Sequence, residues 1–343
     1  MGASPDIPRI GDTDGAPPPW ARALFQSPLT PHLRDQAGRA LVWTIEDGAS
    51  DASVSAQFTT GAADYHHRYA AADHFEGLFR AALEVSGAQV PDRPLILDLG
   101  SGSGVNSVVP CRRLFAGARI VATDLSGELL AMLGASLQGA PDAEATVCVK
   151  MDAMGDLVAP GAFDLVTGSA ILHHLTEPRR GLAAAARALK PGGHAIFFEP
   201  FDGWGLLRFA FARILAESAL RGGALDPATA AGLTTMIADI AMRSAPDNTA
   251  PAFAALDDKW LFSRARMAAW SRKVGFSDVR FVPHMDHPGM YRDVAAVQLR
   301  LVTGRDDLAL PDWAVAILDD LDAAMTYDAR RELMLEGTIV LTR

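Results

Sequence analysis

The sequence predicts an α/β fold, in which apolar, strand-like segments alternate with helix-length stretches through the middle of the chain. Three observations support this prediction. Leu95–Leu99 is an apolar run that stops abruptly in a glycine-rich turn at residues 100–104. A second apolar run, at residues 120–123, ends in the acidic residue Asp124. Further runs follow at helix-length gaps, which is the pattern of strands joined by helices.

The glycine-rich turn favours a close approach of backbone to a ligand. Gly100, Gly102 and Gly104 lack the Cβ that would block such an approach. Turns of this kind also occur in dinucleotide-binding folds. Asp98 favours a ligand with an ammonium group over a dinucleotide. A carboxylate in front of the glycines would repel a pyrophosphate but suits an ammonium group. The alternative is a tight strand-to-helix turn that binds nothing.

The next strand ends carry further polar groups. Asp124 stands where a carboxylate would accept two hydrogen bonds from a ribose diol. Ser126 is positioned to cap a helix over residues 127–137. The third strand, residues 145–149, leads to Asp152, whose side chain is placed to accept from an adenine amino group. Together these positions predict a nucleoside site.

Two more strand-like runs complete an ordered set of five segments. In this order the segments resemble a class I S-adenosylmethionine (SAM)-dependent methyltransferase of the small-molecule type, over about residues 93–200. The segments are Asp-Leu-Gly-Ser-Gly-Ser-Gly at 98–104, the strand end at Asp124, Met151-Asp152-Ala153, Phe163-Asp164-Leu165-Val166 with Leu-His-His-Leu at 172–175, and Leu-Lys-Pro-Gly-Gly at 189–193.

The resemblance implies a doubly wound, mostly parallel, seven-stranded Rossmann-like sheet with SAM across the carboxyl ends of its first strands. Asp98 and the glycines would hold the methionine end, Asp124 the ribose, and Asp152 with Ala153 the adenine. The N-terminal helices would close over SAM and offer Tyr65, although a solvated, histidine-rich helix face explains residues 65–69 equally well. The implied cofactor-binding residues are Tyr65, Asp98, Gly100, Ser101, Gly102, Gly104, Asp124, Leu125, Asp152, Ala153 and Ser169.

We expect four regions along the chain. Residues 1–90 form an N-terminal arm with cap helices, although residues 21–62 have no clear period. Residues 91–200 form the SAM-binding core. Residues 201–262 are a helical lid insertion, with helices over 203–220 and from Asp226 to Arg243. Residues 263–343 hold the last two strands, 279–282 and 337–342, with a second insertion between them. Both insertions would emerge at the ligand-binding edge of the sheet.

The candidates for chemistry are His173, His174 and Glu199. The two histidines follow the fourth strand, beside the expected position of the sulfonium, and are predicted either to position the donor or to act as a general base. Glu199, at the end of the fifth strand, would face the acceptor or cap the following helix. No metal is assigned. His284, Asp286 and His287 have the most suggestive metal-like spacing in the chain and are weak candidates, because such clusters are usually polar loops.

The amino-acid composition argues against some classes of partner and location. A net charge of −10 argues against a nucleic-acid substrate, because phosphate contacts need a basic face. Two cysteines give no disulfide framework, which fits a cytoplasmic location, as does an N-terminus without a signal-peptide pattern. No run reaches the ~18 apolar residues of a membrane span. The apolar stretch 204–215 suits a buried lid, a homodimer interface or the wall of an apolar acceptor site.

The sequence therefore predicts an enzyme that transfers a methyl group from SAM to a small molecule, at oxygen before carbon or nitrogen. One alternative is a protein that binds SAM or S-adenosylhomocysteine without turnover. Another is a SAM-using enzyme with metal-assisted chemistry.

Overall fold

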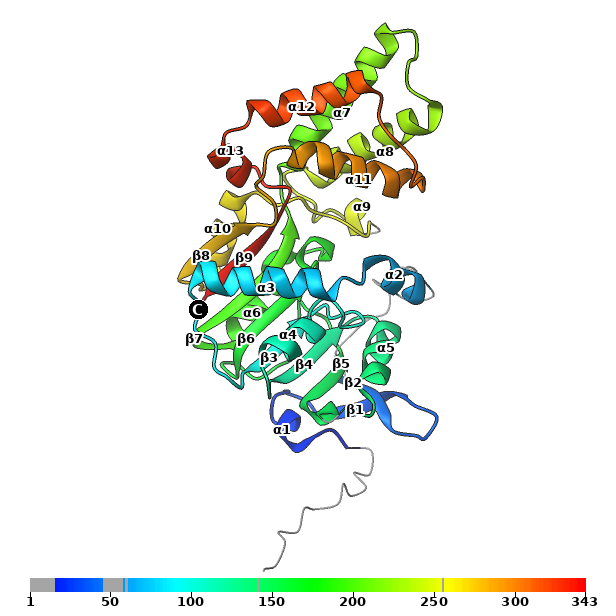
Figure 1. Ribbon diagram of the computed structural model, residues 1–343. Helices are drawn as coiled ribbons and strands as arrows, with labels where there is room; N and C mark the ends of the chain where they lie inside the picture. The colour runs from blue at the N-terminus through cyan, green and yellow to red at the C-terminus, as the bar shows by residue number, and fades with distance from the viewer. Residues whose placement is uncertain (1–15, 46–57, 59–60, 141, 255) are drawn as a thin grey trace, which may run out of the picture.

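A single nine-stranded sheet organises the molecule, in the strand order β1-β2-β5-β4-β3-β6-β7-β9-β8 (Figure 1). The computed structural model describes residues 16–45, 58, 61–140, 142–254 and 256–343. The strands from β2 to β7 run parallel to one another, and β1, β8 and β9 pair antiparallel with their neighbours. The strands are β1 Leu29–Arg34, β2 Ala40–Ile45, β3 Leu95–Leu99, β4 Arg119–Asp124, β5 Thr146–Lys150, β6 Phe163–Ser169, β7 Leu189–Pro200, β8 Asp278–Pro283 and β9 Glu336–Thr342.

The predicted count of seven strands is wrong, because β1 and β2 form a hairpin in the stretch that shows no period in the sequence. This hairpin joins the sheet through the parallel pairing of Trp43 with Val149. β1 is an edge strand, largely exposed, contains Pro31 and is interrupted by register shifts. An edge strand exposed on both faces has no reason to alternate apolar and polar residues, so its pattern is not visible in the sequence.

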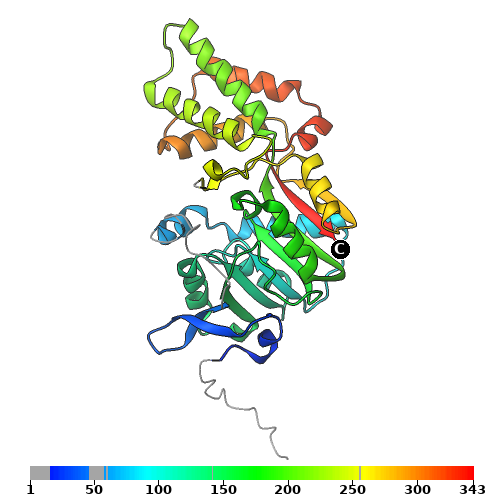
Figure 2. The same ribbon diagram turned by 180° about the vertical axis from the view of Figure 1, so that it is seen from behind.

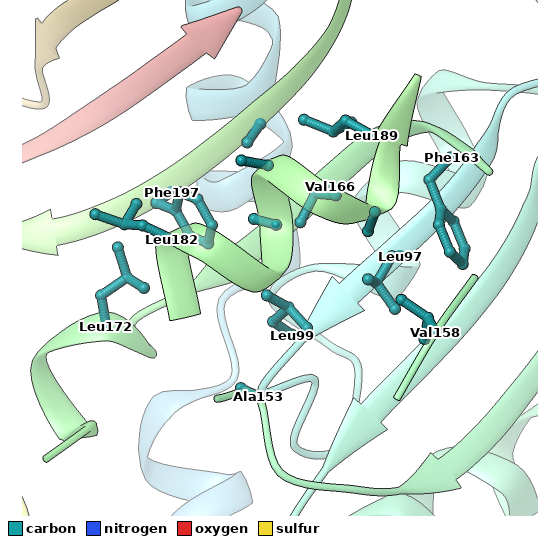
Figure 3. Close-up of a cluster of buried hydrophobic side chains, with 14 of the residues drawn as sticks. Leu97, Leu99, Ala153, Val158, Phe163, Val166, Leu172, Leu182, Leu189 and Phe197 are labelled. Carbon is teal, nitrogen blue, oxygen red and sulfur yellow. The ribbon is translucent and has the colours of Figure 1, made fainter. Parts of the chain in front are cut away.

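Helices cover both faces of the sheet. β3 shows why: Ile96 packs into the core beneath α3, α4 and α5, whereas Leu97 and Leu99 pack into the core beneath α6 and α10. Figure 3 shows part of the second core, where Leu182 of α6 faces Phe197 of β7. These helices are α3 Ala72–Ser86, α4 Val108–Leu114, α5 Gly127–Leu137, α6 Pro178–Ala188 and α10 Arg264–Lys273, with the shorter α1 Pro19–Arg22 and α2 Ala62–Tyr69 before them.

Side-chain caps begin three of the helices, and the first of them is the cap predicted at Ser126. The Ser126 hydroxyl accepts a hydrogen bond from Leu129 N at 3.1 Å and begins α5. The Asp226 carboxylate accepts from the second and third residues of α8. The Ser263 hydroxyl accepts from Arg266 N at 3.1 Å and begins α10. Each cap satisfies a backbone donor that the helix itself leaves open.

A helical unit lies beyond the carboxyl end of β7 (Figures 1 and 2). Four of its helices, two from each insertion, share one hydrophobic core, so the two insertions form one body rather than separate pieces. Phe209 on α7 is 81% exposed, so the apolar stretch 204–215 is not buried on every side. No described helix is long and apolar enough to cross a membrane. The helices are α7 Trp204–Leu220, α8 Pro227–Arg243, α9 Pro251–Ala254, α11 Met290–Thr303, α12 Asp312–Ala324 and α13 Tyr327–Glu332.

Candidate active site

A cavity of about 510 Å³ opens at the carboxyl edge of the parallel strands. Ligands in open α/β sheets bind at this edge. A hollow of about 660 Å³ at the opposite edge, by the first residues of β3 and β4, holds Lys190, which is already paired with Asp164 at 2.6 Å. The edge cavity is lined by Phe58, Gly100, Gly102, Asp124, Leu125, Leu129, residues 151–154, Ser169, Ala170, Ile171, residues 174–176, Pro251, Ala254, Leu256, Asp257 and Lys259.

The three glycines of the turn have different physical reasons for being glycine. All three have positive φ, at 67°, 53° and 76°. A Cβ on Gly100 would lie 2.5 Å from Ile171, and one on Gly104 would lie 2.5 Å from Leu133. A Cβ on Gly102 would meet only Leu129, at 3.9 Å. Gly102 is therefore the position where bare backbone faces open space, whereas Gly104 does not line the cavity and is required by helix packing.

Asp98 lies beneath the turn and does not line the cavity. Its Oδ1 accepts from the Thr167 hydroxyl at 2.6 Å, and its Oδ2 accepts from the Ser107 hydroxyl at 2.5 Å. Burial raises the pKa of this carboxyl to about 6. Ser101 is also buried below the turn, where its hydroxyl accepts from Thr123 N at 3.0 Å. Asp98 therefore does not reach the cavity, and the geometry does not support the expected direct contact between Asp98 and a ligand ammonium group.

The strand ends that follow do reach the cavity. Asp124 accepts from Gly102 N and from Ser126 N, both at 2.8 Å, so it fixes the glycine turn and the start of α5 together. Burial raises the pKa of this carboxyl. Asp152 accepts from Met154 N at 2.8 Å. Leu125, Ala153 and Ser169 line the same space. Because each carboxylate oxygen has more than one lone pair, Asp124 keeps acceptor capacity for a ligand.

The helix that precedes the core meets the glycine turn directly. In α2, His66 Nδ1 lies 2.7 Å from the Ser103 hydroxyl. The side chain of Tyr65, on the same helix, lies outside the described residues. Phe58 lines the cavity, and its ring meets the His174 ring edge-on at 5.5 Å between centroids.

Glu199 neither faces the acceptor side nor caps the helix that follows it. It is 1% exposed and accepts from the backbone N of Ile171 at 3.2 Å, of Leu172 at 2.7 Å and of His173 at 3.2 Å. Because β6 and β7 are parallel neighbours, the end of β7 lies beside the loop that leaves β6. Glu199 therefore caps the short 3₁₀ turn Leu172–His174, and both predictions for it are wrong.

The two adjacent histidines have opposite environments. His173 is buried, and its Nδ1 lies 2.7 Å from Glu199 Oε2. Burial alone would lower the pKa of His173, but the carboxylates of Glu199 and Asp258 outweigh it and raise the pKa to about 9. His174 lines the cavity, and its Nδ1 lies 2.9 Å from the Asp257 carbonyl. Burial, helped by His173, lowers the pKa of His174 to about 3. His174 is thus a neutral imidazole on the cavity wall.

The segment 256–260 completes the cavity, although it contains no motif that indicates a binding site. Leu256, Asp257 and Lys259 line the space opposite the strand ends. Lys259 N donates to the His173 carbonyl at 2.8 Å, and Trp260 Nε1 donates to the Leu175 carbonyl at 2.8 Å. These bonds fasten the lid insertion to the loop after β6. An irregular segment has no period, so the run Asp-Asp-Lys-Trp was its only visible signal.

The weak metal candidates do not converge. His284 Nε2 lies 3.1 Å from the Thr338 hydroxyl, and burial, helped by His74, lowers the pKa of His284 to about 3. Asp286 is paired with Arg331 at 2.6 Å, and His287 contacts the Pro288 carbonyl. Each group is satisfied separately, so the metal-like spacing in sequence does not form a site.

This combination of fold and site defines a class I SAM-dependent methyltransferase domain: a glycine turn after β3, a carboxylate at the end of β4 and a cavity across the carboxyl ends of parallel strands. Residues 97–197 match the family model described as a methyltransferase domain.

The relatives resemble this domain rather than the whole chain. A ubiquinone biosynthesis O-methyltransferase of Xanthomonas oryzae is 36% identical over 33% of this chain and 43% of its own length. An uncharacterized protein of Synechococcus is 38% identical over 29% of this chain and 24% of its own. The chain therefore spans less than half of these relatives. A Haemonchus contortus phosphoethanolamine N-methyltransferase, solved with S-adenosylhomocysteine, is 15% identical with a TM-score of 0.42, over 77% of this chain and 51% of its own.

Proposed function

We propose that this chain transfers a methyl group from SAM to a small-molecule acceptor, at oxygen in preference to carbon or nitrogen. One observation carries the proposal. The cavity is bounded on one side by the strand ends, with Gly102 and Asp124, and on the other by the lid segment, with Leu256 and Lys259. A donor held at the first wall would present its methyl group to an acceptor held at the second, and such alignment supplies much of the rate enhancement.

The residues on the donor wall suit SAM. Asp124 would accept from the ribose hydroxyls, and Asp152 with Ala153 would contact the adenine. The backbone at Gly100 and Gly102, with Ser169, would face the methionine end. Asp98, Ser101 and Gly104 would hold the turn in shape from beneath, without touching the ligand. SAM supplies an activated methyl group, so these residues need only bind it and orient it.

The acceptor wall is mostly apolar, with few polar groups. Leu175, Pro251 and Leu256 supply apolar surface, and His174 and Lys259 supply polar atoms. Small-molecule sites commonly combine an apolar lining with a few placed polar groups in a volume of ~300–1,000 Å³. The resemblance to an O-methyltransferase supports oxygen as the methylated atom.

The test has two stages. Calorimetry with SAM and with S-adenosylhomocysteine measures donor binding. Transfer of labelled methyl from SAM to a panel of phenols, hydroxy acids and amines then measures turnover. Labelled product from a hydroxyl acceptor supports the proposal. Tight SAM binding with no product from any acceptor would instead favour a binding protein without turnover.

Shortening Leu256 should affect the acceptor and spare the donor. Leu256→Ala removes apolar contact from the lid wall only, and a partly exposed Leu loses about 1.4 kcal/mol, or roughly tenfold. We expect the KM for the acceptor to rise about tenfold, while the Kd for SAM stays within about twofold. Leu125→Ala, on the donor wall, is the matched control and should give the reverse pattern. If both variants weaken SAM equally, the two walls do not divide the ligands in this way.

A further inference from the structure

Three side chains with metal-binding atoms meet where the lid segment contacts the loop after β6. His173 and His174 come from the 3₁₀ turn, and Asp258 comes from the lid. One donor atom from each lies within 4.8 Å of the other two. None of the three is adjacent to the cluster at residues 284–287 that the sequence suggested. Two imidazoles and a carboxylate are a recurring ligand set for divalent transition metals.

The distances within this cluster fit shared ligation better than direct hydrogen bonding. Asp258 Oδ1 lies 3.4 Å from His173 Nε2 and 3.3 Å from His174 Nδ1. A charge-assisted hydrogen bond between such groups is typically ~2.7–2.9 Å, as His173 Nδ1 and Glu199 illustrate at 2.7 Å. Two ligands held ~2.0–2.1 Å from one tetrahedral ion lie ~3.3–3.4 Å apart. The carboxylate thus stands at the separation expected across a shared ion.

The surroundings of His173 are those of an oriented metal ligand. Its Nδ1 donates to the buried Glu199 carboxylate, which directs Nε2 toward Asp258. Ligating histidines usually donate their second ring N–H to a carboxylate or carbonyl. Arg243 lies 3.4 Å from the other Asp258 oxygen, Oδ2, and 3.3 Å from Asp239. The positive charge of Arg243 therefore reduces the negative electrostatic potential at the Asp258 carboxylate, but Arg243 also fixes the orientation of that carboxylate. Ligation through Nδ1 requires His174 to carry its proton on Nε2 instead of donating it to Asp257.

We propose that His173, His174 and Asp258 form a binding site for one divalent transition-metal ion, with Zn²⁺ the best match to two nitrogens and one oxygen. Three protein ligands leave the fourth tetrahedral position open, as in catalytic zinc sites. His174 lines the cavity, so the site adjoins the acceptor space, although His173 and Asp258 are not among the lining residues.

The use of this ion rests on the proposed function, although its binding does not. An acceptor hydroxyl at the open position would lose its proton to solvent more easily, because the cation stabilises the alkoxide. The alkoxide oxygen then bonds to the methyl carbon while the carbon–sulfur bond breaks. The products are the methyl ether, S-adenosylhomocysteine and one proton.

The experiment measures metal directly. The full-length chain is stripped with chelator, loaded with Zn²⁺, desalted and analysed for zinc per chain by mass spectrometry. We expect about one zinc per chain in the wild type. We expect Asp258→Asn and His174→Gln each to weaken zinc affinity by at least about 100-fold. Asp258 has a side chain 42% exposed, so its variant should fold, as a thermal melt would verify. His287→Ala is the matched control and should retain full zinc.

Two readouts keep the metal site and the proposed function separate. Equal zinc in the wild type and in Asp258→Asn would overturn the metal site. SAM calorimetry on the same chelator-treated samples reports on the donor site whatever the zinc result. Co²⁺ loading adds a spectroscopic check, because a tetrahedral Co²⁺ site gives visible absorption that the wild type should show and Asp258→Asn should lose.

Discussion

Asp124→Ala is expected to weaken SAM binding by roughly 30–150-fold. The carboxylate lines the cavity at the end of β4 and would accept two hydrogen bonds from the ribose. Hydrogen bonds to charged groups are worth enough that losing this pair costs about 2–3 kcal/mol. The same carboxylate accepts from Gly102 N and Ser126 N at 2.8 Å, so its removal also loosens the turn beneath the donor. Calorimetry with SAM measures the effect.

Two further variants make this result specific. Asp124→Asn keeps one side-chain acceptor and the same volume, so its loss of SAM affinity should be smaller. Asp278→Ala removes an exposed acidic residue at the far edge of the sheet, where it pairs with Arg280, and should leave the Kd unchanged. A wild-type Kd in a folded Asp124→Ala protein would rule out the ribose assignment.

The central strands could be predicted because local signals and burial agree there. β3, β4 and β5 are short, mostly buried runs, and a glycine follows β3 whereas β4 ends at an acidic residue. The helix starts at Ser126, Asp226 and Ser263 depend only on neighbouring residues, and the cap predicted at Ser126 forms. Contacts between residues that are close in the sequence can therefore be predicted from the sequence alone.

Other features depend on contacts between distant segments, which leave no local pattern. The capping of residues 171–173 by Glu199 follows from the parallel pairing of β6 with β7 and not from its neighbours in sequence. Asp258 joins the two histidines across more than eighty residues. The two insertions each present an apolar face, but no short sequence pattern indicates that these two faces pack against each other.

Glu199→Ala is expected to destabilise the protein by about 3–5 kcal/mol. The Glu199 side chain is buried and accepts from three backbone N–H groups and from His173 Nδ1. Alanine would leave these donors buried without an acceptor and the His173 ring without its carboxylate. Losing one partner of a buried pair typically costs this much. Urea unfolding should therefore show a lower midpoint, with the slope of the transition unchanged.

The Gln variant separates this structural role from a role as general base. Glu199→Gln keeps the volume and one acceptor oxygen but turns an amide N–H₂ toward the donors of residues 171–173, so we expect a smaller loss of stability. Its folded fraction should retain turnover within about 10²-fold, because Glu199 does not line the cavity. A variant that unfolds at the wild-type urea concentration and binds SAM normally, yet loses more than about 10⁴-fold in kcat, would contradict this account. Glu199 would then act on the acceptor through a rearrangement of the turn that it caps.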